Sequence, residues 1–145
     1  MRATMTILTI LLVAVALAVA GFAIWVRIAP NDATYWHVDP AAAPDPSTPN
    51  FARVDRVTSL VPDQVAAAIS SIAEAEGARR IAGDERHGTW IVRTRVMGYP
   101  DFISIRLQPE GEGTRVLAFS RSRFGHSDMG VNRARLRRWL GALPE

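Results

Sequence analysis

The sequence predicts an α+β fold: one N-terminal transmembrane helix, followed by a sandwich with the element order β-α-β-β-β-β-α. Three observations support this prediction. The chain begins with an uncharged apolar run, it has one segment with helical spacing of apolar residues, and several short β-branched or aromatic segments follow, separated by Gly/Pro turns. The chain has 145 residues, so what remains after the apolar run is enough for a single small domain.

Residues 1–27 are predicted to form a membrane anchor. The 22 residues from Met5 to Val26 carry no charge. At a rise of about 1.5 Å per residue, such a helix is about 33 Å long, enough to cross the ~30 Å hydrocarbon core of a bilayer. Trp25 and Arg27 stand where an interfacial aromatic residue and a stop charge belong. We therefore expect an uncleaved, single-pass anchor.

A cleaved signal peptide is the alternative for this segment. Arg2, an apolar stretch and the small residues up to Ala20 fit that outline, although the apolar run continues beyond Ala20. The orientation rests on the short N-terminal head, which usually stays in the cytoplasm. We therefore expect an inner (cytoplasmic) membrane protein with a periplasmic domain.

Residues 28–50 are predicted to form a linker rich in Pro and Ala. Its five prolines are Pro30, Pro40, Pro44, Pro46 and Pro49. Proline fixes φ and removes a backbone donor, so regular structure is not expected here. The more apolar stretch from Tyr35 to Pro40 has three interpretations: it folds back onto the domain, it lies at the level of the lipid headgroups, or it is a linker anchored by one buried Trp.

Residues 51–145 are predicted to form one α+β domain. Pro62 starts a helix that Gly77 stops, and its apolar residues recur three and four positions apart. The last three strands are joined by short turns and should form an antiparallel meander, covered on one face by two helices. The expected strands are 52–60, 79–82, 89–97, 102–108 and 114–121, and a closing helix spans 131–143.

Strand alternation places Arg93, Arg95 and Arg106 on the face of the sheet opposite the helices. They form either a solvated face balanced by acids or a secondary anion surface, for which the planar guanidinium fork is suited. Alternation in 114–121 is mixed, because Leu117 and Phe119 share a face with arginines.

The loop before the closing helix is the main candidate site. All 17 basic residues are Arg, the net charge is +3, and the basic excess is concentrated after residue 120. The loop leads into a helix N-terminus, which attracts anions. The candidate ligand or partner residues are Arg121, Arg123, His126, Ser127, Asp128, Asn132 and Arg133. The alternative is that this block stabilises the fold, with Asp128 or Ser127 capping the helix. Arg135 and Arg138 are expected to face solvent.

This block also carries a family resemblance. The run RSRFGHSDMGVNRARLRRWL, with MGYPDF upstream, resembles the bacterial and plastid domain-of-unknown-function family catalogued as number 1499. The resemblance covers roughly residues 50–143 and is most specific around Asp128 to Arg133. The proline-rich segment with WHVDP resembles membrane-anchored members from α-proteobacteria. The resemblance implies an anchored or exported single domain, without assigned catalytic residues.

No catalytic motif names a reaction. The chain has no cysteine, its three histidines lack metal-ligand spacing, and no phosphate-binding loop occurs. The neighbours His126, Ser127 and Asp128 cannot converge as a catalytic triad, whose members come from separate elements. We therefore expect no metal and no cofactor.

The composition favours a non-enzymatic binding or interaction module that contacts anionic lipid, or an acidic surface on a membrane protein complex, rather than nucleic acid. Its contact surface would be the Arg-rich loop and the C-terminal helix. The alternative is a carrier of a small apolar or anionic ligand, with a pocket between sheet and helices; a hydrolase ranks last.

Overall fold

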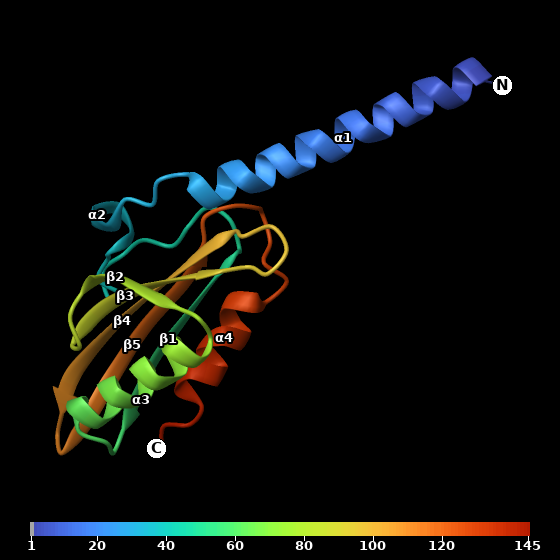
Figure 1. Cartoon of the computed structure of the whole chain (residues 1–145). Helices are drawn as coiled ribbons and strands as arrows, with labels where there is room; N and C mark the ends of the chain where they lie inside the picture. Colours follow the sequence, from blue (N-terminus) through green and yellow to red (C-terminus); the bar gives the residue numbers. More distant parts are fainter. Residues whose placement is uncertain (1) are drawn as a thin grey trace.

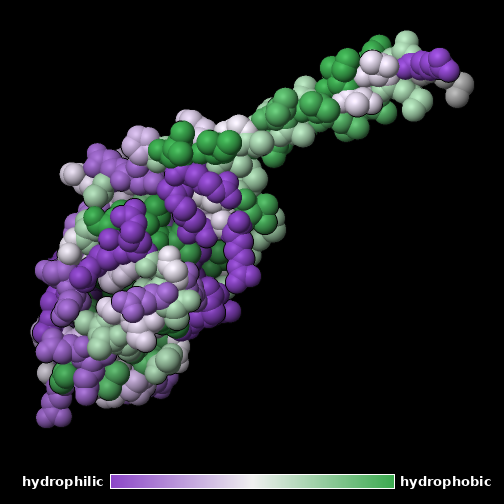
Figure 2. Space-filling view, viewed as in Figure 1, coloured by the Kyte–Doolittle hydropathy of each residue, from purple (hydrophilic) through white to green (hydrophobic). Residues whose placement is uncertain are grey.

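The computed structural model describes residues 2–145, and its N-terminal helix projects from the domain like a stem (Figure 1). This helix, α1 (Arg2–Ile28), is long and apolar enough to cross a membrane, and none of its most apolar stretch is buried against the domain. Hydrophobic side chains cover most of its length (Figure 2). The structure therefore has one apolar N-terminal helix of the length that an anchor or a signal sequence requires.

The domain contains one five-stranded sheet, which confirms the predicted α+β class. The strand order is β1-β5-β4-β3-β2, and every neighbouring pair is antiparallel. β3, β4 and β5 are consecutive neighbours and form the predicted meander. The strands are β1 (Phe51–Thr58), β2 (Arg79–Gly83), β3 (His87–Arg93), β4 (Pro100–Glu110) and β5 (Gly113–Ser122).

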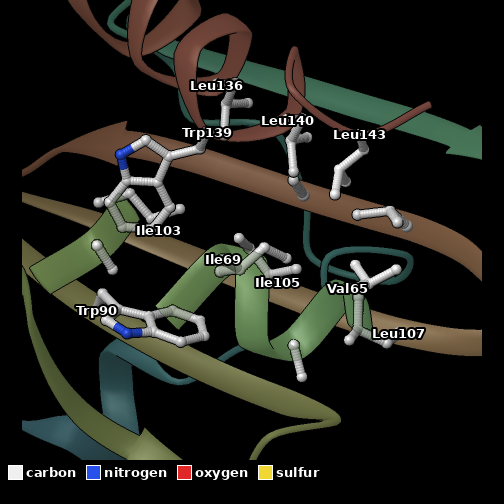
Figure 3. Close-up of a cluster of buried hydrophobic side chains, with 14 of the residues drawn as sticks. Val65, Ile69, Trp90, Ile103, Ile105, Leu107, Leu136, Trp139, Leu140 and Leu143 are labelled. Atoms are coloured by element: carbon white, nitrogen blue, oxygen red, sulfur yellow. The ribbon is translucent and has the colours of Figure 1, made fainter. Parts of the chain in front are cut away.

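Two helices pack on one face of this sheet. α3 (Pro62–Ala75) begins at the proline that fits a first helical turn, and Gly77 follows it with φ +70°. α4 (Val131–Leu140) ends three residues earlier than expected, yet Leu143 beyond it is still buried. Figure 3 shows the core between these layers, where Trp90 and Trp139 meet edge to face at 6.1 Å.

The opposite face of the sheet is covered by the segment that was predicted to be a linker. α2 (Ala33–Trp36) is a single helical turn capped by Asp32. Trp36 stacks on Phe102 of β4 with ring centroids 3.9 Å apart and planes 7° apart. Of the three interpretations of 35–40, folding back onto the domain is the one observed, because Val38 and Asp39 also contact the sheet. Residues 33–48 are called the covering segment below.

The covering segment explains the mixed alternation of β5. Phe119 and Leu117 point away from the helices and are 2% and 7% exposed. A half-open sheet face would leave such residues in water, whereas here residues 33–48 exclude it. Residues 28–50 are thus packed on the domain rather than forming a free tether.

Candidate functional site

The end of the sheet nearest α1 is fastened to the base of that helix. Arg27 donates hydrogen bonds to the carbonyls of Val96 (2.6 Å) and Met97 (2.9 Å) in the β3–β4 turn. Gly98 makes this approach possible: its φ is +74°, and a Cβ there would lie 2.7 Å from the Arg27 side chain. Val26 is fully buried. The last turn of the helix is therefore packed against the domain and hydrogen-bonded to it.

Four aromatic rings surround this junction. Phe22 meets Tyr99 at 6.3 Å, Trp25 meets Phe124 at 5.7 Å, and Tyr99 and Phe124 are 5.8 Å apart. Two rings come from the helix and two from the domain. Aromatic rings, Trp and Tyr above all, favour the boundary between hydrocarbon and headgroups, so this cluster has the composition of a membrane-interface belt.

Two loop residues, one before β4 and one before α4, expose apolar side chains. Val96 in the β3–β4 turn is 83% exposed, and Met129 in the loop before α4 is 96% exposed. Met129 also has φ +51°, a left-handed conformation that costs a non-glycine residue roughly 1–2 kcal/mol. Ser127 Oγ accepts from the Met129 N–H, which helps to hold this conformation.

Within the predicted loop site, Asn132 and Asp128 serve the fold. Asn132 is fully buried, and its amide donates to Asn50 O, Ser122 Oγ and Asp128 Oδ2. Asp128 also accepts from the backbone N–H groups of Gly130 and Asn132, so it satisfies a donor of the helix end although Gly130 is the N-cap residue. Burial alone would raise the pKa of Asp128, but these hydrogen bonds outweigh it and lower that pKa.

Arg121 lies deep under the covering segment instead of on the loop surface. Its side chain donates to Trp36 O at 2.6 Å and to Ser104 Oγ at 3.3 Å, and only 6% of the residue is exposed. Its guanidinium lies 4.6 Å from the centre of the Phe119 ring. Burial, with the neighbouring Arg53, lowers the pKa of Arg121 to about 10, so it remains charged at neutral pH.

The other predicted loop residues stay near the surface. Arg123 is half-buried and donates to Pro30 O and Asn31 Oδ1, both at 2.8 Å. His126, Ser127 and Arg133 are exposed. The predicted site is thus divided between one buried cation, one structural network and an exposed rim.

The expectation that Arg93, Arg95 and Arg106 share an open face is wrong. β3 ends at Arg93, which donates to the carbonyls of Val26 and Gly98 at the base of α1. Arg95 is exposed in the following turn, because the strand does not continue to residue 97. Arg106 pairs with Asp39 of the covering segment.

The expectation for Arg135 is also wrong. This residue is 4% exposed and donates to Asp101 Oδ2 at 2.8 Å. Arg138 does reach the surface, where it pairs with Glu76 of α3 at 2.7 Å. The basic side chains of α4 therefore contribute less free charge than their number indicates.

Between α3 and the sheet, the void lined by Ala66, Ile69 and Trp90 is too small to admit a water molecule. A more open hollow of about 620 Å³ lies between β1 and α4 and is lined by Phe51, Arg133 and Leu136 among others. Two further hollows lie under the covering segment, with volumes of about 620 and 450 Å³. In residues 2–145 the structure contains no group of three or more His, Asp or Glu side chains arranged to hold a metal ion.

The sequence profile of the DUF1499 family, described as a protein of unknown function, matches residues 37–143. This chain belongs to the DUF1499 family. The match begins at His37, so most of the covering segment lies inside the DUF1499 region, which extends further towards the N-terminus than the resemblance at residues 50–143 indicated.

Two solved structures resemble this DUF1499 chain weakly. Protein CV1439 from Chromobacterium violaceum is 15% identical, with a TM-score of 0.38, over 63% of this chain and 90% of that one. TTHA0849 from Thermus thermophilus is 13% identical, with a TM-score of 0.32, over 62% of this chain and 86% of that one. No curated protein sequence matches the chain.

Several residues of this DUF1499 site gave no clear signal in the sequence. Asn50 is 2% exposed and donates to Gly125 O at 2.7 Å, which ties the start of β1 to the candidate loop. Tyr99 and Phe124 join the aromatic cluster from turns that looked merely connective. Their one available signal was aromatic character in short Gly-containing loops, next to Gly98 and Gly125.

Proposed function

We propose that this protein is a membrane-anchored, non-enzymatic interaction module whose α1-proximal end rests on an anionic lipid surface. The membrane is the inner (cytoplasmic) one, α1 stays attached as its single-pass anchor, and the domain lies on the periplasmic side. The observation that carries the proposal is the aromatic cluster of Phe22, Trp25, Tyr99 and Phe124, in which the domain itself extends the interfacial end of α1.

The charge at this end supports an anionic partner. Arg95 and Arg133 are exposed there, and no hydrogen bond or ion pair joins either side chain to another of residues 2–145. The nearby acids are already engaged: Asp101 pairs with Arg135, and Asp128 accepts backbone N–H groups. A basic side chain near an anionic membrane contributes about 1 kcal/mol, so two such residues give useful but salt-sensitive attraction.

The exposed loop tips support a bilayer rather than an acidic protein. Val96 lies at the base of α1, where its carbonyl accepts from Arg27, and Met129 follows Phe124 of the aromatic cluster by five residues in the same loop. We expect a membrane around α1 to bring both to the headgroup region. Burying exposed apolar side chains there is favourable, and it would offset the cost of the left-handed Met129 backbone. An acidic protein partner would gain nothing particular from apolar tips beside an anchor.

The absence of cysteine allows single-site labelling of the full chain. A fluorophore on Val96→Cys or Met129→Cys, in nanodiscs with nitroxide headgroups, should be strongly quenched. The same label on Glu112→Cys, in the exposed β4–β5 turn at the far end of the sheet, should not. Quenching should increase with the share of phosphatidylglycerol and decrease with salt. Equal quenching at all three sites would overturn the proposal.

Charge variants test the lipid contact directly. Arg95→Gln with Arg133→Gln should remove about 2 kcal/mol, a roughly 30-fold change in the ratio of docked to undocked domain on anionic nanodiscs. Arg115→Gln is the matched control, because that arginine pairs with Asp55 near the far end of the sheet. Docking that ignores phosphatidylglycerol would refute an anionic lipid partner. In intact cells, an impermeant thiol reagent should label Glu112→Cys; labelling only after lysis would reverse the proposed orientation.

A further inference from the structure

A groove of about 450 Å³ opens under the covering segment, on the side of the sheet away from α3 and α4. This volume is in the range of small-molecule sites. Aromatic and aliphatic side chains make up much of its lining, among them Tyr35, Trp36, Val38 and Phe119, together with Pro44 and Pro46. The groove therefore offers apolar walls to a ligand body.

Arg121 supplies a buried positive charge to this groove. Unlike its neighbours on the same face, it has no carboxylate within ion-pair distance anywhere in the described residues, 2–145. Arg53 pairs with Asp45 at 2.7 Å, Arg115 with Asp55 at 2.7 Å, and Arg106 with Asp39. The face thus has an acid for each of those three cations and none for Arg121.

The volume of a hollow does not decide whether it can bind an anion, as the neighbouring hollow of about 620 Å³ shows. It is larger, but its two arginines, Arg53 and Arg115, both have aspartate partners that also line it. Its lining is therefore electrically balanced. In the smaller groove Asp45 is neutralised by Arg53, so Arg121 and Arg123 leave an uncompensated positive charge.

Arg121 also retains hydrogen-bonding capacity. A guanidinium has five N–H donors, and the contacts with Trp36 O and Ser104 Oγ use one N–H on each terminal nitrogen. Burying a cation without an anion is costly, and a carbonyl dipole offsets only part of that cost. An incoming anion would both occupy the remaining donors and supply the missing charge.

We propose that this groove binds a small organic anion, with a single carboxylate at Arg121 and an apolar body against Trp36 and Phe119. The proposal is independent of how the domain rests on the bilayer. The same chemistry has two possible sources, a water-soluble aromatic acid and a fatty acid arriving from the membrane. Experiments on the full chain can separate them.

The first experiment titrates the full chain, in phosphatidylcholine nanodiscs, with 4-phenylbutyrate and with 4-phenylbutanol, which has the same body without the charge. The readouts are the NMR signals of the Trp36 indole and the Arg121 guanidinium. The acid should bind at least tenfold more tightly than the alcohol and shift both signals. Equal affinity, or shifts confined to other residues, would overturn the proposal. Because these nanodiscs lack anionic lipid, the result does not depend on lipid docking.

The source is tested by doping the nanodiscs with oleate. If oleate shifts the Trp36 and Arg121 signals to saturation, and 4-phenylbutyrate then causes no further shift, the result indicates a fatty acid ligand. Shifts with 4-phenylbutyrate alone indicate a soluble acid.

Variants then test the cation. Arg121→Gln should weaken 4-phenylbutyrate binding at least tenfold, whereas Arg115→Gln, on the same face of β5 but paired with Asp55, should leave it unchanged. If Arg121→Gln does not fold, Arg121→Lys retains the charge without the planar fork and should bind the acid with intermediate affinity. An Arg121→Gln protein that folds and binds the acid as the parent does would refute the site.

Discussion

Arg135 of α4 donates to Asp101 of β4 at 2.8 Å, and the two side chains are only 5% and 3% exposed. This ion pair joins the last helix to the start of the central strand across 34 residues of sequence. Arg135 also donates to Asn132 Oδ1 at 3.1 Å, so the pair is connected to the network that holds the loop before α4.

Breaking the Arg135–Asp101 pair should destabilise the domain strongly. Asp101→Ala leaves a buried guanidinium uncompensated, and we expect a loss of about 3–5 kcal/mol in the free energy of unfolding, measured by urea denaturation. Glu76→Gln, which breaks the more exposed pair with Arg138, should cost less than about 1 kcal/mol. Similar losses for both variants would contradict the importance assigned to burial.

Asn132 should matter far more than its neighbour Arg133. Asn132→Ala removes hydrogen bonds to Asn50, Ser122 and Asp128, and the buried partners left unsatisfied should cost about 3 kcal/mol. Amide exchange in residues 123–130 should accelerate in the same variant. Arg133→Ala, at an exposed position, should change the stability by no more than about 0.5 kcal/mol.

The covering segment should detach more easily at low pH. The His37 ring forms a hydrogen bond with Thr89 Oγ1 at 2.9 Å. It also lies 4.2 Å from the ring of His87, which donates a hydrogen bond to Val38 O. Burial, then the neighbouring His87, lowers the pKa of His37 below 6.5, with Asp84 acting in the opposite direction. The detached segment therefore takes up protons first. Packing of the covering segment on the sheet is fully favoured above about pH 6.5 and weakens as the pH falls below it.

Amide exchange of residues 38–48 measures this effect, between about pH 7.5 and about pH 5.5 and corrected for intrinsic rates. Protection should fall over this range in the parent chain and change less in His37→Gln. His126→Gln, which alters an exposed loop histidine, should retain the parental pH profile. A parental profile in His37→Gln would assign the effect to another group.

Gly98 should control the rigidity of the junction with α1. Gly98→Ala meets two obstacles, a φ of +74° and a Cβ contact of 2.7 Å with Arg27. Gly111→Ala is a matched control, since its φ is +59° but the space around it is open. Both should cost roughly 1–2 kcal/mol in backbone strain, but only Gly98→Ala should increase the mobility of a spin label on the domain relative to α1. Equal mobility in the two variants would show that Arg27 does not fix the joint.

The regular elements were predictable because their signals are local. Pro62 and Gly77 mark the two ends of α3, and the alternation of Ile103, Ile105 and Leu107 identifies the helix-covered face of β4. These patterns report neighbours within a few residues, and a single sequence contains that information in full.

The parts that were missed depend on contacts between distant residues. Arg135 lies three residues after Asn132 and four before Trp139, so helical spacing places it on the buried face, but nothing in the sequence identifies Asp101 as its partner. The prolines of 28–50 argued against regular structure, and the segment does lack it beyond one turn. That it nevertheless packs on the sheet follows from Trp36 and Asp39 meeting Phe102 and Arg106.

The clamp of Arg27 on the Val96 and Met97 carbonyls limits what the domain can reach. A head on a slack tether sweeps out a hemisphere and can catch objects well above its support. With stem and head joined in this way, a bilayer around α1 would let the domain move mainly by rotation or tilt of the helix itself. In that arrangement, large partners would have to diffuse in, or lie flat upon, the same sheet of membrane, whereas small solutes would still arrive from the water.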